Sequence, residues 1–342
     1  MNHIDPKQKV AILRVLRDAG RAVGSREIAQ KIQASGFDLS PRTVRLYLQH
    51  LEEKGLVEHA KRGRSGGRRI SRKGVEEIAD AGALDRLGFT AAKVDRLAWE
   101  MDYDIQSGTG QIVLNITLLD EAYLPHACRE MGAVFQAGLG MGQRAALVPA
   151  GERIGDITVP PDKVAVGTIC SVTVNGVLLN YRVNANSRFG AVLELRDGIP
   201  ARFTDLISYD GTTLDPLEIF IRARLTDVHN AAVTGNGRIG VSFREIPTPA
   251  LDCLWSVQKE LASHGLGGIL LIGKPNQPLL DFPVNEGRTG FIVAGGLNPA
   301  AAIEEAGIPT TNMALSSLYE FEKMLNYKDL QERALEITAN RQ

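Results

Sequence analysis

The stretch Gly167–Leu195, GTICSVTVNGVLLNYRVNANSRFGAVLEL, has an echo about one hundred residues later, GILLIGKPNQPLLDFPVNEGRTGFIVAG. At a constant offset, Asn175 aligns with Asn276, and after one residue drops out Arg188 aligns with Arg288. A repeated strand core explains repeated apolar positions but not a repeated Asn and Arg-x-Gly. The alignment therefore predicts a duplicated unit with one Asn and one Arg at equivalent turns of each copy.

The segments around these stretches repeat as well. Each copy has the pattern of a strand, a helix that ends at Gly-Leu-Gly, further strands and a second helix. The strands and first helices are predicted at Gln111–Leu119 with Ala122–Gln136, and at Arg238–Ile246 with Pro249–Ser263. The second helices are expected after Ile199-Pro200 and Asn298-Pro299, followed by C-terminal helices at Leu315–Leu325 and Lys328–Ala339. We predict an α+β chain whose duplicated α/β sensor body spans residues 85–236, with an insertion near 141–166, and 237–342.

Charge divides the chain into two parts. Residues 1–74 contain 17 Lys and Arg against 7 Asp and Glu, whereas the remainder contains 22 against 33, so a net charge of −1 hides a basic module and an acidic body. This asymmetry indicates a polyanionic partner for the first part only.

Residues 1–80 have the order of a winged helix-turn-helix module. Two helices precede a third that begins at Ser40-Pro41, a natural N-cap and first turn, and ends at Gly55. A strand and the basic hairpin of residues 61–69 follow. Such a module places its third helix in the major groove of double-stranded DNA. Some winged helices bind protein instead, and that alternative stays open.

Two residue sets are predicted to contact DNA. Arg42 and Arg45 are expected to read base edges, because an arginine fork matches the two acceptors of guanine. The hairpin is expected to contact phosphate, which supplies affinity without sequence information. The full predicted set is Arg26, Ser40, Arg42, Thr43, Arg45 and Tyr47 in the helices, and Lys61, Arg62, Arg64, Arg68 and Arg69 in the hairpin.

Several other functions are disfavoured by the sequence. The three cysteines and six histidines show no zinc spacing, and no nucleophile–base set is apparent, so neither a metal site nor an enzyme is expected. The segment Gly235–Gly240 matches G-x-G-x-x-G, but a strand follows it instead of a helix, so no nucleotide cofactor is expected. No apolar run is long enough to span a membrane, and the chain is expected in the cytoplasm.

Polar residues at the repeated turns are the candidates for binding a small carboxylate effector. Two arginines, one per copy, are suited to hold the two ends of a dicarboxylate. The alternative is that each arginine only fixes the turn of its own copy. The candidate effector-binding residues are Asn175, Asn186, Ser187, Arg188, Asn276, Arg288 and Asn298.

Five segments of the body, GTICSVTVNGVLL, NSRFGAVLE, FREIP, GKPNQPLL and GRTGFIVAGGLNPAAAIEEAGI, resemble the regulatory domain of the NrpR family of nitrogen-regulation repressors. The winged helix also fits that family. The resemblance implies a homodimeric transcriptional repressor that binds an operator upstream of nitrogen-assimilation genes and is released by 2-oxoglutarate. A regulator that responds to another small carboxylate, an enzyme fused to a DNA-binding module, and a protein-binding scaffold are the alternatives.

Overall fold

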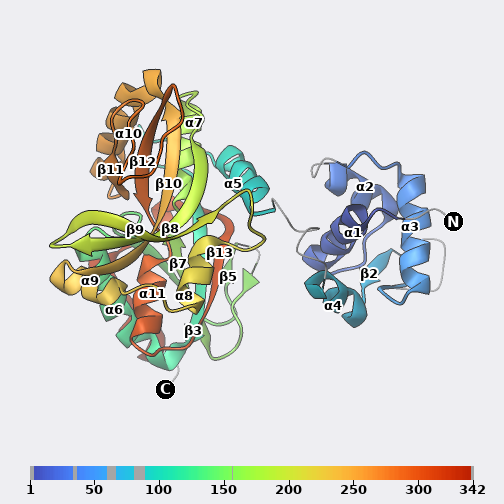
Figure 1. Cartoon of the computed structure of the whole chain (residues 1–342). Coiled ribbons are helices and arrows are strands. Elements are labelled where there is room, and N and C mark those ends of the chain that lie inside the picture. The colour runs from blue at the N-terminus through green and yellow to red at the C-terminus, as the bar shows by residue number, and fades with distance from the viewer. Residues whose placement is uncertain (1–3, 34–36, 60–66, 81–88, 156, 340–342) are drawn as a thin grey trace. The chain divides into compact units, whose positions relative to one another are not determined.

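A computed structural model describes residues 4–33, 37–59, 67–80, 89–155 and 157–339. The chain forms two compact units, Met1–Leu87 and Gly88–Gln342, here called the N-terminal unit and the body (Figure 1). The body includes both copies of the predicted repeat, so the duplication builds one compact unit.

The N-terminal unit has the predicted order of a winged helix. Its elements are α1 (Pro6–Ala19), α2 (Ser25–Gln33), α3 (Pro41–Glu53), β1 (Val57–His59), β2 (Arg68–Ile70) and α4 (Arg72–Asp80). The Ser40 side chain accepts a hydrogen bond from the Thr43 N–H, so Ser40 caps α3 as its sequence position predicts. Val44, Leu48 and Leu51 lie on the buried face of α3, which leaves its other face to solvent.

Two five-stranded antiparallel sheets form the frame of the body. The first has the order β13-β3-β7-β4-β14 and the second β11-β12-β10-β8-β9. Their strands are β3 (Gln111–Asp120), β4 (Arg144–Val148), β7 (Lys163–Ile169), β13 (Thr310–Glu320) and β14 (Leu325–Asn326), then β8 (Asn186–Arg196), β9 (Ile199–Ser208), β10 (Gly237–Pro247), β11 (Ile269–Ile272) and β12 (Arg288–Ala294). A small hairpin, β5 (Arg153–Ile154) and β6 (Ile157–Thr158), lies between β4 and β7.

Helices connect these strands. They are α5 (Phe89–Glu100), α6 (Leu124–Gln136), α7 (Val172–Asn180), α8 (Pro216–Arg222), α9 (Val228–Thr234), α10 (Leu251–Ser263), α11 (Asn298–Glu305) and α12 (Leu330–Ala339). Short 3₁₀ turns stand before α6 and α10 at equivalent places, Glu121–Tyr123 and Thr248–Ala250. Two more, Phe321–Lys323 and Tyr327–Asp329, follow β13 and β14. α6 packs against α9, α11 and α12, whereas α7 packs against α5 and α10.

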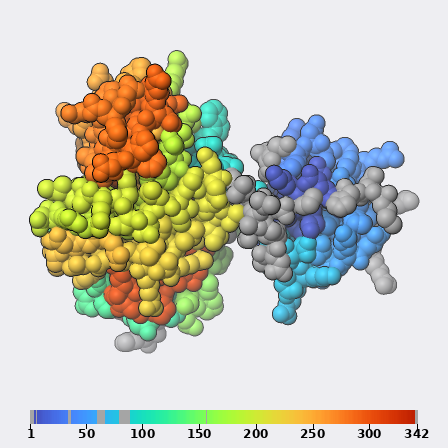
Figure 2. Space-filling model, in the orientation of Figure 1, coloured from blue at the N-terminus to red at the C-terminus, as the bar shows by residue number. Residues whose placement is uncertain are grey.

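The duplication is real, and its two copies exchange their ends. β3, α6, β4 and β7 of the first copy correspond to β10, α10, β11 and β12 of the second, since β7 pairs with β3 as β12 pairs with β10. The next helix and strand of each copy, α7 with β8 and α11 with β13, then join the other copy's sheet. Figure 2 shows this exchange: green atoms of the first copy and red atoms near the end of the chain lie together in one lobe.

The predicted alignments of Asn175 with Asn276 and of Arg188 with Arg288 are wrong, because Arg188 lies in β8 whereas Arg288 begins β12, the counterpart of β7. Asn175 lies inside helix α7, whereas Asn276 has a left-handed backbone (φ 54°) in the connection between β11 and β12. The strand register instead makes Ile169 the counterpart of Ala294, because each pairs with the equivalent position of β3 or β10. The segment VTVNGVLLN is β-branched and apolar, and a short run of this kind does not distinguish a strand from a buried helix.

Two expected helices are also absent. The helix predicted after Ile199-Pro200 is strand β9, and Leu315–Glu320 of the predicted helix Leu315–Leu325 belongs to β13. The helices expected after Asn298-Pro299 and within Lys328–Ala339 are confirmed as α11 and α12. Residues 141–166 contain β4 and its connection to β7, whose counterpart is β11 with its connection to β12.

Candidate functional site

The exposed face of α3 carries the residues predicted to read DNA. Arg42 and Arg45 are exposed on the first half of the helix, and neither has a hydrogen bond or ion pair with a described residue. Two guanidinium groups are therefore free at the end of the helix that enters the major groove in winged helices.

The other helical residues of the predicted set surround these arginines. Ser40 and Thr43 share a hydroxyl–hydroxyl hydrogen bond of 2.8 Å at the start of α3, which fixes both side chains beside the cap. Tyr47 is half-buried against the core of the N-terminal unit, and Arg26 is exposed on α2. Tyr47 thus contributes to packing whatever else it contacts.

The basic hairpin is only partly described. Lys61, Arg62 and Arg64 lie outside the described residues. Arg68 forms an ion pair of 2.7 Å with Glu52 of α3, and its side chain is only 14% exposed. Arg69 is exposed and lies 3.4 Å from Glu58 across the β1–β2 pair. The Arg68 side chain therefore links the hairpin to α3 through its ion pair, whereas the exposed Arg69 side chain can contact an external anion.

In the body, strand pairing gathers several candidate effector residues at one end of the second sheet. Asn186, Ser187 and Arg188 begin β8, and Ser187 pairs in register with Arg244 near the end of β10. Arg288 begins β12 and pairs with Pro247 on the other side of β10. Asn175 joins this group from α7, because its side-chain amide donates to the Ser187 hydroxyl at 3.1 Å.

One face at this end of the sheet holds a closed ion-pair network. The Glu245 carboxylate is 1% exposed and accepts from Arg188 at 2.8 Å. It also accepts from the backbone and side chain of Asn285 at 3.1 and 2.9 Å. The charge of Arg188 is thus compensated within the fold.

The opposite face holds a buried guanidinium with a different environment. Arg244 is 1% exposed and donates to the hydroxyl oxygens of Ser171 and Ser187 at 2.9 and 3.3 Å. Its third nitrogen, Nη1, has no hydrogen-bond partner among the described residues. Burial lowers the pKa of Arg244.

Of the three remaining candidates, two have side-chain hydrogen bonds to described residues and the third has none. Asn298 bonds the Gly240 N–H, the Gly240 carbonyl and the Leu139 carbonyl, so its amide is fully used in joining α11 to β10. Asn276 accepts from the Gly287 N–H and stabilises its own turn. Arg288 is half-buried, and its side chain has no hydrogen bond with a described residue.

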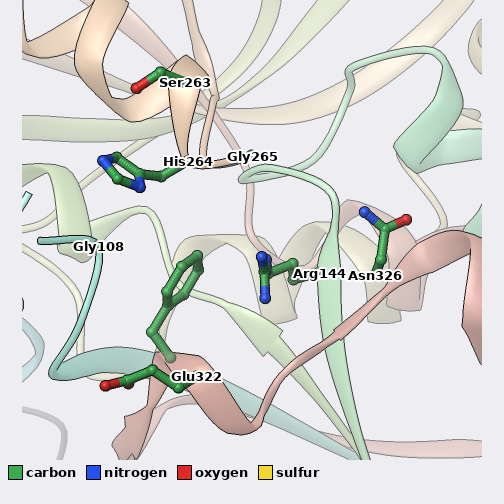
Figure 3. Close-up of a pocket in the computed structure, with 8 residues that line it drawn as sticks. Gly108, Arg144, Ser263, His264, Gly265, Glu322 and Asn326 are labelled. Carbon is green, nitrogen blue, oxygen red and sulfur yellow. The ribbon is translucent and has the colours of Figure 1, made fainter.

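A cavity of about 480 Å³ lies elsewhere in the body. Figure 3 shows His264 on one wall and Glu322 on the opposite wall, with Arg144 beside them. Arg144 donates to the Met324 carbonyl and lies 4.8 Å from the centroid of the Phe321 ring. The lining of the cavity therefore includes both a cation that already has partners, Arg144, and a carboxylate, Glu322.

A second, small cavity is lined by Ser171, which accepts a hydrogen bond from Arg244. It has a volume of about 10 Å³, room for one water, and its lining includes Ser171, Tyr209, Asp215 and Val94. Burial and the neighbouring Glu218 raise the pKa of Asp215 to about 7. Burial raises the pKa of Cys170, which also lines this cavity, to about 11, so its thiol stays protonated at neutral pH.

Arg244, Glu245 and Ser171 are not among the residues predicted from the sequence. The available signal was the adjacent pair of opposite charges in Gly240–Pro247, GVSFREIP, inside a strand that is otherwise apolar. Charged residues are rarely buried without a specific partner, so such a pair inside a predicted core strand marks a candidate site.

Metal ligation and membrane insertion receive no support from the described residues. No group of three or more His, Cys, Asp or Glu side chains there is placed to hold a metal ion. No helix within the described part of the chain has the length and apolarity needed to cross a membrane.

Comparison with known proteins links both units to characterised families. Residues 87–326 match the family described as NrpR regulatory domains NRD1 and 2, and residues 10–78 match the ribonuclease R winged-helix domain. The chain is 30% identical over 318 residues to the global nitrogen regulator NrpRI of Methanosarcina mazei, which covers 93% of this chain and 97% of the relative.

Two longer relatives and one solved structure agree with that match. Global nitrogen regulators NrpR from Methanocaldococcus jannaschii and Methanococcus maripaludis are 29% and 27% identical over 76% and 94% of this chain. The alignments cover only 44% and 55% of those two proteins. The crystal structure of a nitrogen repressor-like protein from Methanococcus jannaschii is 28% identical, with a TM-score of 0.58, over 71% of this chain and 98% of that chain.

Proposed function

The chain belongs to the NrpR family, and we propose that it is a transcriptional repressor of nitrogen-assimilation genes. In this proposal it binds operator DNA as a homodimer through the winged helix of each subunit, and 2-oxoglutarate releases it. The names of its relatives as global nitrogen regulators support the regulatory role.

The observation that carries the DNA-binding part is the exposed pair Arg42 and Arg45 on the first half of α3. No described carboxylate neutralises either guanidinium, so both are available to acceptors on guanine or phosphate.

An edge strand of the body supports self-association. β9 is the outer strand of its sheet and exposes the apolar side chains of Ile199 and Leu206, which are 67% and 47% exposed. Exposed edges and apolar patches of this kind are commonly covered by a partner. A second copy of the chain meets this requirement and supplies the two DNA-binding units that a two-half-site operator needs.

Release by 2-oxoglutarate requires that the effector and DNA oppose each other's binding. If 2-oxoglutarate weakens DNA affinity by a given factor, DNA weakens 2-oxoglutarate affinity by the same factor. This reciprocity gives the proposal a quantitative check.

The test is a fluorescence anisotropy titration of the full chain with DNA from upstream of nitrogen-assimilation genes, and with scrambled DNA of the same length. We expect tighter binding to the genuine sequence, and release on addition of 2-oxoglutarate. Equal, salt-insensitive affinity for both DNAs would contradict operator binding. Release by succinate or glutarate but not by 2-oxoglutarate would keep the repressor and change its effector.

A further inference from the structure

Arg244 is a buried cation without a counter-ion. Its side chain is 1% exposed on β10, and its two hydrogen bonds go to neutral serine hydroxyls. No described carboxylate lies within ion-pair distance of its guanidinium, and Nη1 is left without a partner. A charged group in this position is costly, because burial removes its hydration and two neutral hydroxyls replace only part of that interaction.

The neighbouring carboxylate cannot serve as that counter-ion. Successive side chains of a strand point to opposite faces of the sheet, so Glu245 faces away from Arg244. Glu245 is already surrounded by Arg188 and Asn285. The register extends this separation to β8, where Ser187 lies with Arg244 and Arg188 lies with Glu245.

The surroundings of Arg244 present hydrogen-bond donors. Ser171 occupies the N-cap position of α7, yet its side chain makes no capping hydrogen bond and accepts from Arg244 instead. Ser187 likewise accepts from Arg244 and from Asn175. Since each hydroxyl accepts these bonds with its oxygen, its own hydrogen remains to be donated. Arg244 Nη1 and two O–H groups therefore suit an oxyanion.

The small cavity next to Ser171 connects this site to the beginning of the body. Ser171 and Val94 line the same space, and Val94 belongs to α5. α5 is the first helix of the body after residues 81–88, which follow the winged helix in sequence. The lining also includes Tyr209 and Asp215, at the two ends of the irregular segment between β9 and α8. A ligand larger than one water must widen this cavity and displace one of these walls.

We propose that Arg244, with the hydroxyls of Ser171 and Ser187, binds a carboxylate group of the effector beside the N-terminus of α7. The inference rests on the proposed function, in which a small dicarboxylate releases DNA, and it gives that effector a place. Binding there widens the cavity and moves α5, the first helix of the body. The ligand supplies the negative charge that the fold does not.

The 480 Å³ cavity at Arg144 is the competing site. It is larger, but Arg144 is already engaged by the Met324 carbonyl and the Phe321 ring there, and Glu322 in the same lining accepts from the Gly110 N–H. An anion entering that cavity gains less from a cation that already has partners than from Arg244, whose Nη1 has none among the described residues. The two arginines therefore form a matched pair for substitution.

Isothermal titration calorimetry of the full chain with 2-oxoglutarate tests the proposal in four proteins: wild type, Arg244→Met, Ser171→Ala and Arg144→Met. We expect binding to weaken at least 100-fold in Arg244→Met and about 5- to 20-fold in Ser171→Ala, with Arg144→Met close to wild type. Circular dichroism and thermal melts establish that each variant is folded. If Arg244→Met fails to fold, Ser171→Ala and Ser187→Ala decide, because each removes only one donor.

The outcomes separate the site from the function. Wild-type affinity in Arg244→Met and Ser171→Ala, or a loss confined to Arg144→Met, overturns the Arg244 site and leaves the proposed function standing. If the wild-type protein does not bind 2-oxoglutarate but binds glutarate or acetate, and Arg244→Met loses that binding, the site stands and the effector assignment falls. Failure of all three anions to bind wild type overturns both.

Discussion

The two units place their arginines in contrasting surroundings. In the N-terminal unit, Arg68 is paired with Glu52, whereas Arg42 and Arg45 are exposed without a described partner. In the body, Arg188 is paired with Glu245, whereas Arg244 is buried without a carboxylate partner in the described part of the chain. Each unit thus combines a compensated cation that stabilises the fold with an uncompensated one.

The difference between the units is the exposure of the uncompensated cation. An exposed guanidinium is hydrated, costs the fold little, and is open to a large polyanion such as DNA. A buried guanidinium is accessible only to a small anion and gains more from it, because the local dielectric constant is lower. Exposure therefore separates a DNA contact from a metabolite contact.

The largest expected effect is on the compensated pair of the body. Glu245→Ala should lower the free energy of unfolding by about 3–5 kcal/mol, because it leaves Arg188 without its partner and removes three hydrogen bonds from a buried carboxylate. Guanidinium chloride denaturation of the full chain measures it. Glu194→Ala removes a half-buried carboxylate of the same sheet whose partners, Arg196 and Arg202, are exposed, so it should have a smaller effect. Equal losses would contradict the special role of Glu245.

The second effect concerns the exposed arginines. Arg42→Ala should weaken binding to the operator by about 1–3 kcal/mol, through loss of a two-pronged contact to a base edge. The loss should be confined to specific DNA, as shown by competition with scrambled DNA in a gel-shift titration. Arg17→Ala, an exposed arginine at the end of α1, is the matched control. Unchanged operator affinity in Arg42→Ala would show that another face of the unit contacts DNA.

A smaller effect separates the two described hairpin arginines. Arg68→Ala should cost about 1–2 kcal/mol of stability, because a largely buried charged hydrogen bond to α3 is lost. Arg69→Ala should change stability by less than about 0.5 kcal/mol, since its pair is exposed. Arg69→Ala should instead reduce the salt dependence of DNA binding. The reverse assignment of these effects would show that Arg68 contacts phosphate.

The last prediction concerns how the free energy of unfolding changes with pH. Burial and Glu218 raise the pKa of Asp215 from 3.8 to about 7, while Lys93 acts in the opposite direction. Between these values the folded protein keeps a proton that the unfolded chain has lost. Stability contributed by this group must therefore fall as pH rises from about 4 to about 7.

Asp215→Asn should flatten that slope in denaturation curves collected across this pH range. Tyr209 and Cys170 line the same cavity, but burial raises their pKa values well above this window, so they do not contribute to it. An unchanged slope in Asp215→Asn would show that another group is responsible.

The sequence predicted local structure best where one residue type has a strong conformational preference. Ser40-Pro41 at the start of α3 and Gly-Leu-Gly after α6 and α10 were identified correctly, and Gly138 and Gly265 have left-handed φ values of 70° and 72°. It failed at Val172–Asn180, where β-branched apolar residues form a helix because tertiary packing buries them on nearly all sides.

The candidate effector residues show the same limit. Asn175, Ser187 and Arg188 were selected from a repeat that was aligned in the wrong register, yet the fold brings them to one end of one sheet. Arg244 and Glu245 were missed, because their importance depends on which face of β10 each one occupies. That assignment requires the strand register and the bulge between Phe243 and Arg244.

The sequence by itself determined the basic winged-helix module, the duplication of the body and the resemblance to a family, since charge, capping residues and repeated motifs are local properties. Only the tertiary structure decided that the two copies exchange a helix and a strand, and that Glu245 pairs with Arg188 while Arg244 has no carboxylate partner among the described residues. The physical reason is that hydrogen-bond and charge compensation depend on neighbours far away in the chain, and strand pairing chooses those neighbours.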